Sequence, residues 1–88
     1  MHYVYLLQLN NGEIYTGSTQ DLKRRIVEHT EGEVASTKHK RPLKVILYEA
    51  YLLKSDAQRR EKYLKTTEGK RFLRQQIRDY FKINHLGL

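Results

Sequence analysis

Cysteine is absent from this chain of 88 residues, and proline occurs once, as Pro42. Without cysteine the protein can form neither disulfides nor thiolate metal sites, which is typical of a reducing compartment such as the cytoplasm. No apolar run approaches the length that crosses a membrane, and the first residues show neither a basic leader nor a small-residue cleavage site. We therefore expect a cytoplasmic protein without membrane contact, folded as one domain over residues 1–88.

Acidic residues are outnumbered, because 17 Lys and Arg face 10 Asp and Glu, for a formal net charge of +7. The basic residues are spread over several segments and do not form one tail. This distribution predicts a basic surface that contacts a polyanion, with nucleic acid as the main candidate. The alternative is a basic soluble protein that has no polyanionic partner.

The stretch EIYTGSTQDLKRRIVEH predicts a strand, a tight turn and a helix in succession. Ile14–Thr16 form a short β-run, and Gly17 is expected to supply the backbone freedom that the turn needs. Either Ser18 or Thr19 is expected to cap the helix, and Gly32 to end it.

The predicted helix has an apolar stripe formed by Leu22 and Ile26 at 100° per residue, with Arg25 and His29 on its edge. Arg24 points away and is interpreted as solvated. A guanidinium at the rim of an apolar face needs an anionic partner. For Arg25 that partner is either a protein carboxylate or a bound phosphate.

The Asn-Asn-Gly sequence at residues 10–12 predicts a hairpin turn between two strands. A two-residue loop would pair Leu7 with Thr16, which would put Tyr5 and Tyr15 on opposite faces. A three-residue loop with its glycine left-handed would pair Leu7 with Tyr15 instead. In that register the two tyrosines share one face of the sheet.

The second half of the chain predicts one strand and two helices. Residues 43–53 form the strongest strand pattern, expected to complete a three-stranded antiparallel sheet and to be buried on both faces. Ser55 is expected to cap a helix, with Gln58 completing a capping box. A further helix over about 70–83 would bury Leu73, Ile77, Tyr80 and Phe81. The fold class is therefore α/β of the α+β type, a small three-stranded antiparallel sheet flanked by three helices in the order β-β-α-β-α-α.

Glu61 is an unusual residue at its position, because it projects between Ala57 and Leu64 on the inner stripe of the helix that Ser55 begins. A buried carboxylate without a partner is costly. Glu61 therefore either forms an ion pair, with Arg25 or Arg60, or binds a metal ion.

Short motifs follow one another in a fixed order along most of the chain. They are Tyr3-Val4-Tyr5, Tyr15-Thr16-Gly17, Arg25, Thr37-Lys38, Arg41-Pro42-Leu43-Lys44, Tyr48-Glu49, Ala57, Arg60-Glu61-Lys62 and Leu64-Lys65. In their order and spacing these motifs resemble the signature of the GIY-YIG nuclease superfamily. The resemblance covers about residues 2–67 and is closest to the small standalone single-domain members, with similarity to the N-terminal nuclease domain of the bacterial excision-repair incision subunit.

The resemblance implies an endonuclease that hydrolyses phosphodiester bonds of DNA, in repair or recombination, with one divalent cation, Mg²⁺ or Mn²⁺. It implies that Tyr5 and Tyr15 converge, so we expect the three-residue hairpin loop. By the same resemblance, Glu61 is the metal ligand, Arg25 clamps a phosphate, and the two tyrosines orient or deprotonate water. His29 is an auxiliary base or a phosphate donor.

The polar connection over residues 33–42 is strongly basic. We expect Lys38, Lys40 and Arg41 to contact a phosphate backbone, which would give salt-dependent affinity that is blind to sequence. The alternative is a solvated loop.

One residue departs from the family pattern. Ser18 stands where the excision-repair nuclease domain carries a lysine, which removes one cation from the expected site. We expect no appended DNA-binding domain, so that a protein partner or a homodimer would supply further targeting. Two other functions are open, an inactive nucleic-acid-binding module of the same fold and a small protein that docks on a larger repair complex.

Overall fold

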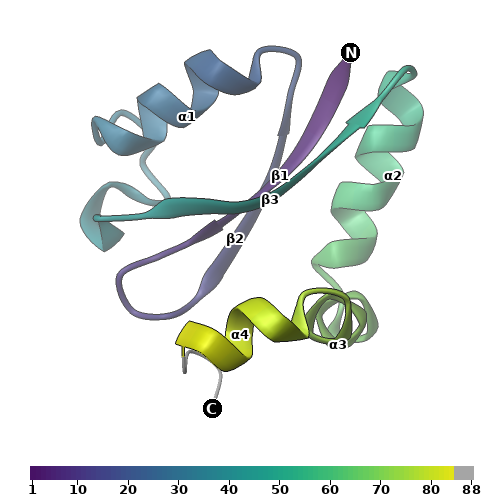
Figure 1. Ribbon diagram of the computed structural model, residues 1–88. Helices are drawn as coiled ribbons and strands as arrows, with labels where there is room; N and C mark the ends of the chain where they lie inside the picture. Colours follow the sequence, from purple (N-terminus) through teal and green to yellow (C-terminus); the bar gives the residue numbers. More distant parts are fainter. Residues whose placement is uncertain (85–88) are drawn as a thin grey trace.

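The computed structural model describes residues 1–84, which form a three-stranded sheet with helices on both faces (Figure 1). The expected α+β class and the order β-β-α-β-α-α are confirmed, with the last helix divided in two. The elements are β1 (His2–Gln8), β2 (Ile14–Thr19), α1 (Leu22–Thr30), the 3₁₀ turn η1 (Lys38–Lys40), β3 (Lys44–Tyr51), α2 (Lys54–Leu64), α3 (Thr67–Gln76) and α4 (Arg78–Asn84).

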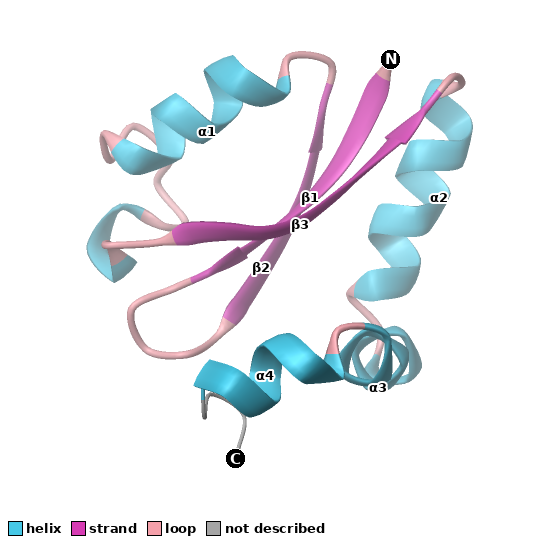
Figure 2. Cartoon of the chain, in the orientation of Figure 1, coloured by secondary structure: helices cyan, strands magenta, loops and turns pink. Residues whose placement is uncertain are grey.

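The sheet is antiparallel in the order β2-β1-β3, so β1 lies in the centre (Figure 2). On one face Tyr5 and Leu7 pack under α1, against Leu22 and Ile26. On the other face lies the core beneath α2 and α3, formed by Val4, Leu6, Ala57, Leu64 and Leu73. Because both faces of the sheet are covered at β1, the sequence of β1 is an almost continuous run of apolar and aromatic residues.

The strand β3 was expected to be buried on both faces, and that prediction is wrong. β3 is an edge strand, and its side chains are partly or fully exposed, with 56% of Tyr48 and 38% of Val45 accessible. Apolar content cannot show where a strand sits in a sheet, because the central position depends on pairing partners distant in sequence.

The hairpin between β1 and β2 has the three-residue loop. Leu7 pairs with Tyr15, the Leu9 amide donates to the Glu13 carbonyl at 2.9 Å, and Gly12 has a φ of 88°. A left-handed residue at this position is favourable only for glycine. This register places Tyr5 and Tyr15 on the face that α1 covers.

The predicted cap of α1 is wrong. β2 continues through Thr19, and the N-cap is Asp21, whose carboxylate accepts a hydrogen bond from the Arg24 amide at 3.2 Å. The Thr19 hydroxyl instead accepts from the Asp21 amide at 3.1 Å. The end of α1 is as predicted, since Gly32 has a φ of 79° and its amide donates to a carbonyl of the last turn.

The boundaries of the later helices also differ from the prediction. α2 begins at Lys54, one residue before the expected cap Ser55, and its N-cap, Leu53, makes no side-chain cap. The helix expected over about 70–83 begins earlier, where the Thr66 hydroxyl accepts from the Gly69 amide at 3.0 Å. It is interrupted at Ile77, whose φ of −118° and ψ of 38° are not helical. In residues 1–84 there is no helix with the length and apolar content needed to cross a membrane.

Candidate active site

Three aromatic side chains from different elements converge on the face of the sheet that α1 covers. The Tyr5 hydroxyl from β1 lies 2.8 Å from Nε2 of His29 from α1. Tyr15 from β2 lies beside both, with ring centroids 5.1 Å from His29 and 6.3 Å from Tyr5. The structure therefore brings together three of the residues predicted from sequence.

Gly17 is required in β2 for space. It pairs with Tyr5 across the hairpin, and a methyl group added to it would meet the Tyr5 hydroxyl oxygen at 2.5 Å. The sequence analysis predicted a tight turn at Gly17, and that prediction is wrong. Gly17 lies within β2 and its φ is not positive. The small residue lets the end of the Tyr5 ring lie directly over the neighbouring strand.

His29 is fully buried, and both of its ring nitrogens have partners. Nε2 faces Tyr5, and Nδ1 lies 2.8 Å from the hydroxyl of Thr37, which is also fully buried. Burial lowers the pKa of His29, and the nearby Arg25 charge lowers it further, so the ring is neutral at neutral pH. His29 therefore stands behind Tyr5, where it orients that hydroxyl and does not reach solvent.

The role of Thr37 was not predicted. Its position in the family pattern was noted, but no periodicity links a loop threonine to a histidine eight residues earlier on a helix. The contact between Thr37 and His29 forms only in the folded chain, where the connection after α1 returns to that helix. Thr37 fixes the orientation of the His29 ring through this hydrogen bond to Nδ1.

Tyr5 is held in its protonated form. Burial raises its pKa to about 12, although a hydrogen bond from Arg25 acts in the opposite direction. Tyr5 is 1% exposed, whereas Tyr15 is partly exposed. Tyr15 is thus the tyrosine of the cluster that solvent can reach.

Arg25 finds its anionic partner within its own helix. Its guanidinium donates to the Glu28 carboxylate at 3.0 Å, and this bond, together with a hydrogen bond to Tyr5, raises the pKa of Arg25. The same bond lowers the pKa of Glu28. Arg25 is therefore a permanent cation beside the tyrosine cluster.

Glu61 approaches the site from α2, on the opposite face of the sheet from the tyrosines. Its carboxylate accepts from the Ser18 hydroxyl at 2.7 Å and from the Lys65 ammonium at 2.9 Å. The alternative ion pairs considered from sequence are not formed, because Arg25 binds Glu28 and Arg60 binds Glu49 at 3.0 Å.

Successive side chains of β2 point to opposite faces of the sheet, which explains how residues from both faces meet at one edge. Tyr15 and Gly17 point toward α1, whereas Ser18 points toward α2 and its Glu61. β2 is an outer strand of the sheet, so its edge lies between the two sets of side chains. The contact between Ser18 and Glu61 was not predicted, since the sequence analysis considered Ser18 only as a candidate helix cap and as a missing cation.

Glu61 has the chemistry of a single-carboxylate ligand for a hard cation. Burial raises its pKa, but hydrogen bonds from Lys65 and Ser18 and the charges of Lys65 and Lys62 outweigh burial, so the net pKa lies below the ordinary value. Among residues 1–84 no group of three or more His, Cys, Asp or Glu side chains could hold a metal. Mg²⁺ suits such a site, because it retains several waters and needs few protein ligands.

Replacing Ser18 tests how the Glu61 carboxylate is oriented. For the metal-dependent nuclease that the family resemblance implies, we expect Ser18→Ala to raise the Mg²⁺ concentration for half-maximal cleavage by about 10- to 100-fold, the range for loss of a hydrogen-bond partner that orients a metal ligand. The measurement is cleavage of a labelled DNA over a magnesium titration. Ser36→Ala removes a hydroxyl from an exposed loop and should change nothing. An unchanged magnesium requirement in Ser18→Ala would show that this contact is dispensable.

A cavity of about 590 Å³ opens beside this edge, between the N-terminal parts of α1 and α2. Arg25 and Ser18 line it, which connects it to the residues described above. Arg24 and Lys54 add two further cations to its wall, and Asp21 and Glu28 add two carboxylates. The cavity can accept an anionic group next to the tyrosine cluster.

The basic connection has partners within the chain. Arg41 donates through Nε to the Lys38 carbonyl at 3.0 Å and through a terminal nitrogen to the Thr30 carbonyl at 3.3 Å, which anchors the end of α1. Lys40 lies 3.6 Å from the Glu13 carboxylate, and Lys38 is exposed. The nucleic-acid contacts predicted for Lys38, Lys40 and Arg41 stay predictions.

Comparison with known proteins gives one consistent answer. The family described as "GIY-YIG catalytic domain" matches residues 1–75. A UPF0213 protein of Staphylococcus epidermidis is 39% identical over 66 residues, which span 74% of this chain and 80% of the relative. A UPF0213 protein of Staphylococcus aureus is 36% identical over 74 residues, 83% of this chain and 90% of the relative.

A solved structure agrees with this match. The solution NMR structure of a UPF0213 protein from Bacillus halodurans is similar with a TM-score of 0.57 and 33% sequence identity, over 86% of this chain and 84% of that chain.

Proposed function

The chain belongs to the GIY-YIG catalytic-domain family, a family of nucleases, and from this premise we propose that it is a metal-dependent endonuclease that hydrolyses phosphodiester bonds of DNA. The observation that carries the proposal is the convergence of Tyr5, Tyr15 and His29 beside Arg25, at the sheet edge where Ser18 holds Glu61. Repair or recombination is the proposed setting.

The residues divide into those that touch the substrate and those that position them. Tyr15 is proposed to contact the attacking water, because it is the accessible tyrosine. Tyr5 and His29 are positioning residues, since both are buried and joined by a hydrogen bond. A positioned hydroxyl contributes to catalysis by orienting the nucleophile and helping to move its proton.

Arg25 is proposed to bind the phosphate whose ester bond breaks. It lines the cavity, it is always charged, and its planar fork matches two phosphate oxygens. Glu28 holds the guanidinium in place before substrate arrives. Negative charge grows on the phosphoryl oxygens in the transition state, so a fixed cation at this point lowers the barrier.

Glu61 is proposed to hold Mg²⁺ or Mn²⁺. When bound, such an ion would act as a Lewis acid on the phosphate and would favour ionised water. Ser18 fixes one carboxylate oxygen, and Lys65 neutralises the other. Lys38, Lys40 and Arg41 are proposed to contact the DNA backbone, and further targeting by a protein partner or a homodimer stays part of the proposal.

The test is cleavage of end-labelled DNA in duplex, single-stranded, flap and branched forms, with matched RNA strands, in Mg²⁺, Mn²⁺ or EDTA. We expect internal cuts that require the metal. Binding of these substrates without any cut in either metal would instead favour an inactive binding module of the same fold. Absence of both binding and cutting would favour a protein that docks on a larger complex.

A further inference from the structure

Phe72 is a large apolar residue on α3 that is 53% exposed. It stands between two hollows in the surface, of about 420 and 290 Å³, and lines both. Its inner neighbour is Tyr63, whose ring centroid lies 6.4 Å away at an interplanar angle of 43°. This contact fixes one side of the Phe72 ring and leaves the other side accessible.

Polar groups that can form hydrogen bonds surround the ring. The Gln75 amide lines both hollows, and Gln76 and Arg60 line the larger one. Arg60 already donates to the Glu49 carboxylate and to the side-chain amide oxygen of Gln76, so the wall of this hollow is preordered. An amide offers both a donor and an acceptor, which suits the edge of a nucleobase.

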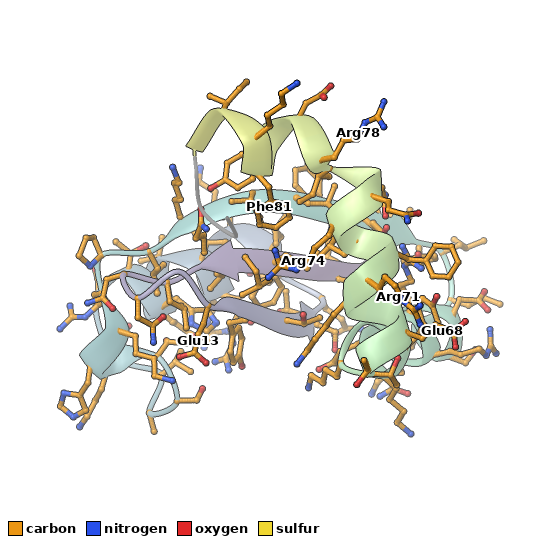
Figure 3. The ribbon with its side chains drawn as sticks, turned by 90° about the horizontal axis from the view of Figure 1, so that it is seen from below. Glu13, Glu68, Arg71, Arg74, Arg78 and Phe81 are labelled. Atoms are coloured by element: carbon orange, nitrogen blue, oxygen red, sulfur yellow. The ribbon has the colours of Figure 1, made fainter. Side chains whose placement is uncertain are left out.

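The helices around Phe72 carry a marked excess of positive charge. Figure 3 shows Arg71, Arg74 and Arg78 along α3 and α4. In these two helices the exposed basic residues are Lys70, Arg71, Arg74, Arg78 and Lys82, against the exposed acidic residues Glu68 and Asp79. The surface of α3 and α4 as a whole therefore favours a polyanion, and beside the ring itself Arg60 and Arg71 line the hollows together with Glu68.

We propose that Phe72 is a stacking platform for an unpaired nucleobase, with Gln75 at the base edge and Arg71, which lines the smaller hollow, near the phosphates. The inference deepens and rests on the proposed function, because it names substrates that contain single-stranded segments. Aromatic rings interleaved with basic side chains bind single strands without sequence preference, since every base has a π-face. None of the residues in this platform belongs to the tyrosine cluster or to the Glu61 contact.

An apolar protein surface fits this site less well. The two hollows are lined by Phe72 and Tyr63 together with amide and charged side chains only, so an apolar partner would bury polar groups without pairing them. A nucleotide in a strand provides a flat ring, a polar base edge and a negatively charged phosphate together. Those three features match the ring, the amides and the cations of the platform.

The first test measures binding of a labelled dT20 strand in EDTA, where no cleavage occurs. We expect Phe72→Ala to weaken binding about tenfold and Phe72→Leu to weaken it almost as much, because leucine keeps the packing on Tyr63 but has no π-face. Tyr48→Ala is the matched control, since Tyr48 is an aromatic side chain on β3 with 56% exposure. Equal losses in Phe72→Ala and Tyr48→Ala would overturn the platform.

The second test uses the absence of tryptophan from the chain. Phe72→Trp should retain binding and place the single tryptophan of the chain on the platform, and dT20 should quench its emission while a blunt duplex does not. Binding of dT20 without quenching would overturn the platform and leave the nuclease proposal untouched. Conversely, loss of cleavage without loss of dT20 quenching, as expected for Glu61→Gln, would separate the platform from catalysis.

Discussion

Replacing Glu61 with glutamine is expected to lower the cleavage rate on the order of 10³-fold while DNA binding persists. Loss of a residue that only hydrogen-bonds to a metal ligand lowers metal affinity or activity by about 10- to 100-fold. Glu61 is proposed as the ligand itself, so its loss should cost more. Glutamine keeps an oxygen that can accept from Ser18 but lacks the charge that attracts a hard cation. Single-turnover cleavage of labelled DNA over a magnesium titration measures the effect.

The substitution should leave the fold intact. The main interaction lost is the ion pair with Lys65, whose side chain is 55% exposed, and such pairs contribute less than about 1 kcal/mol. Thermal unfolding followed by circular dichroism checks this point. Glu31→Gln, which removes an exposed carboxylate at the end of α1, is the control for net charge. Wild-type cleavage by Glu61→Gln would refute the assignment of Glu61 as the metal ligand.

Replacing Arg25 with alanine is expected to lower kcat by about 10²- to 10³-fold, the range for removing one preorganised group that stabilises transition-state charge. The substitution removes a cation that lies beside Tyr5 and lines the cavity. Arg25→Lys should recover only part of the rate, since an ammonium keeps the charge but cannot bind two phosphate oxygens at once. Steady-state kinetics on the best substrate separate kcat from KM.

Arg24 provides the matched control. It is the preceding residue on α1, it lines the same cavity, and it pairs with the same carboxylate, Glu28, at 3.3 Å. Its side chain is 76% exposed, and the Tyr5 hydrogen bond belongs to Arg25. Arg24→Ala should raise KM through the lost charge and leave kcat unchanged. If both alanine variants changed kcat equally, the special role of Arg25 would be wrong.

The proposed site is a junction of two cores. Tyr5 belongs to the core under α1, and Ser18 faces the core under α2, yet both lie at the same end of the β1–β2 hairpin. Each set of side chains is fixed by its own packed layer, so the tyrosines and the carboxylate are positioned independently. Gly17 directly precedes Ser18 on β2 and pairs with Tyr5 on β1. Because it has no side chain, the Tyr5 ring can approach the strand closely.

Several features followed from the sequence because their causes are local. The Asn-Asn-Gly turn, with the family resemblance, gave the register that pairs Leu7 with Tyr15, and Gly32 ended α1 as expected. Helical spacing placed Ala57 and Leu64 in the core. A helix face and a glycine at a helix end depend on residues within a few positions of one another, whereas the turn residues left two hairpin registers open and the family resemblance chose between them.

Other features appeared only in the tertiary structure. The sequence could not show that β3 is an edge strand, that Ser18 holds Glu61, or that Thr37 orients His29. Each depends on which elements become neighbours after folding, and no periodicity carries that information. Thus the sequence by itself determined the fold class and the candidate residues, whereas packing of helices on both faces of the sheet decided which of them meet and which partners hold them.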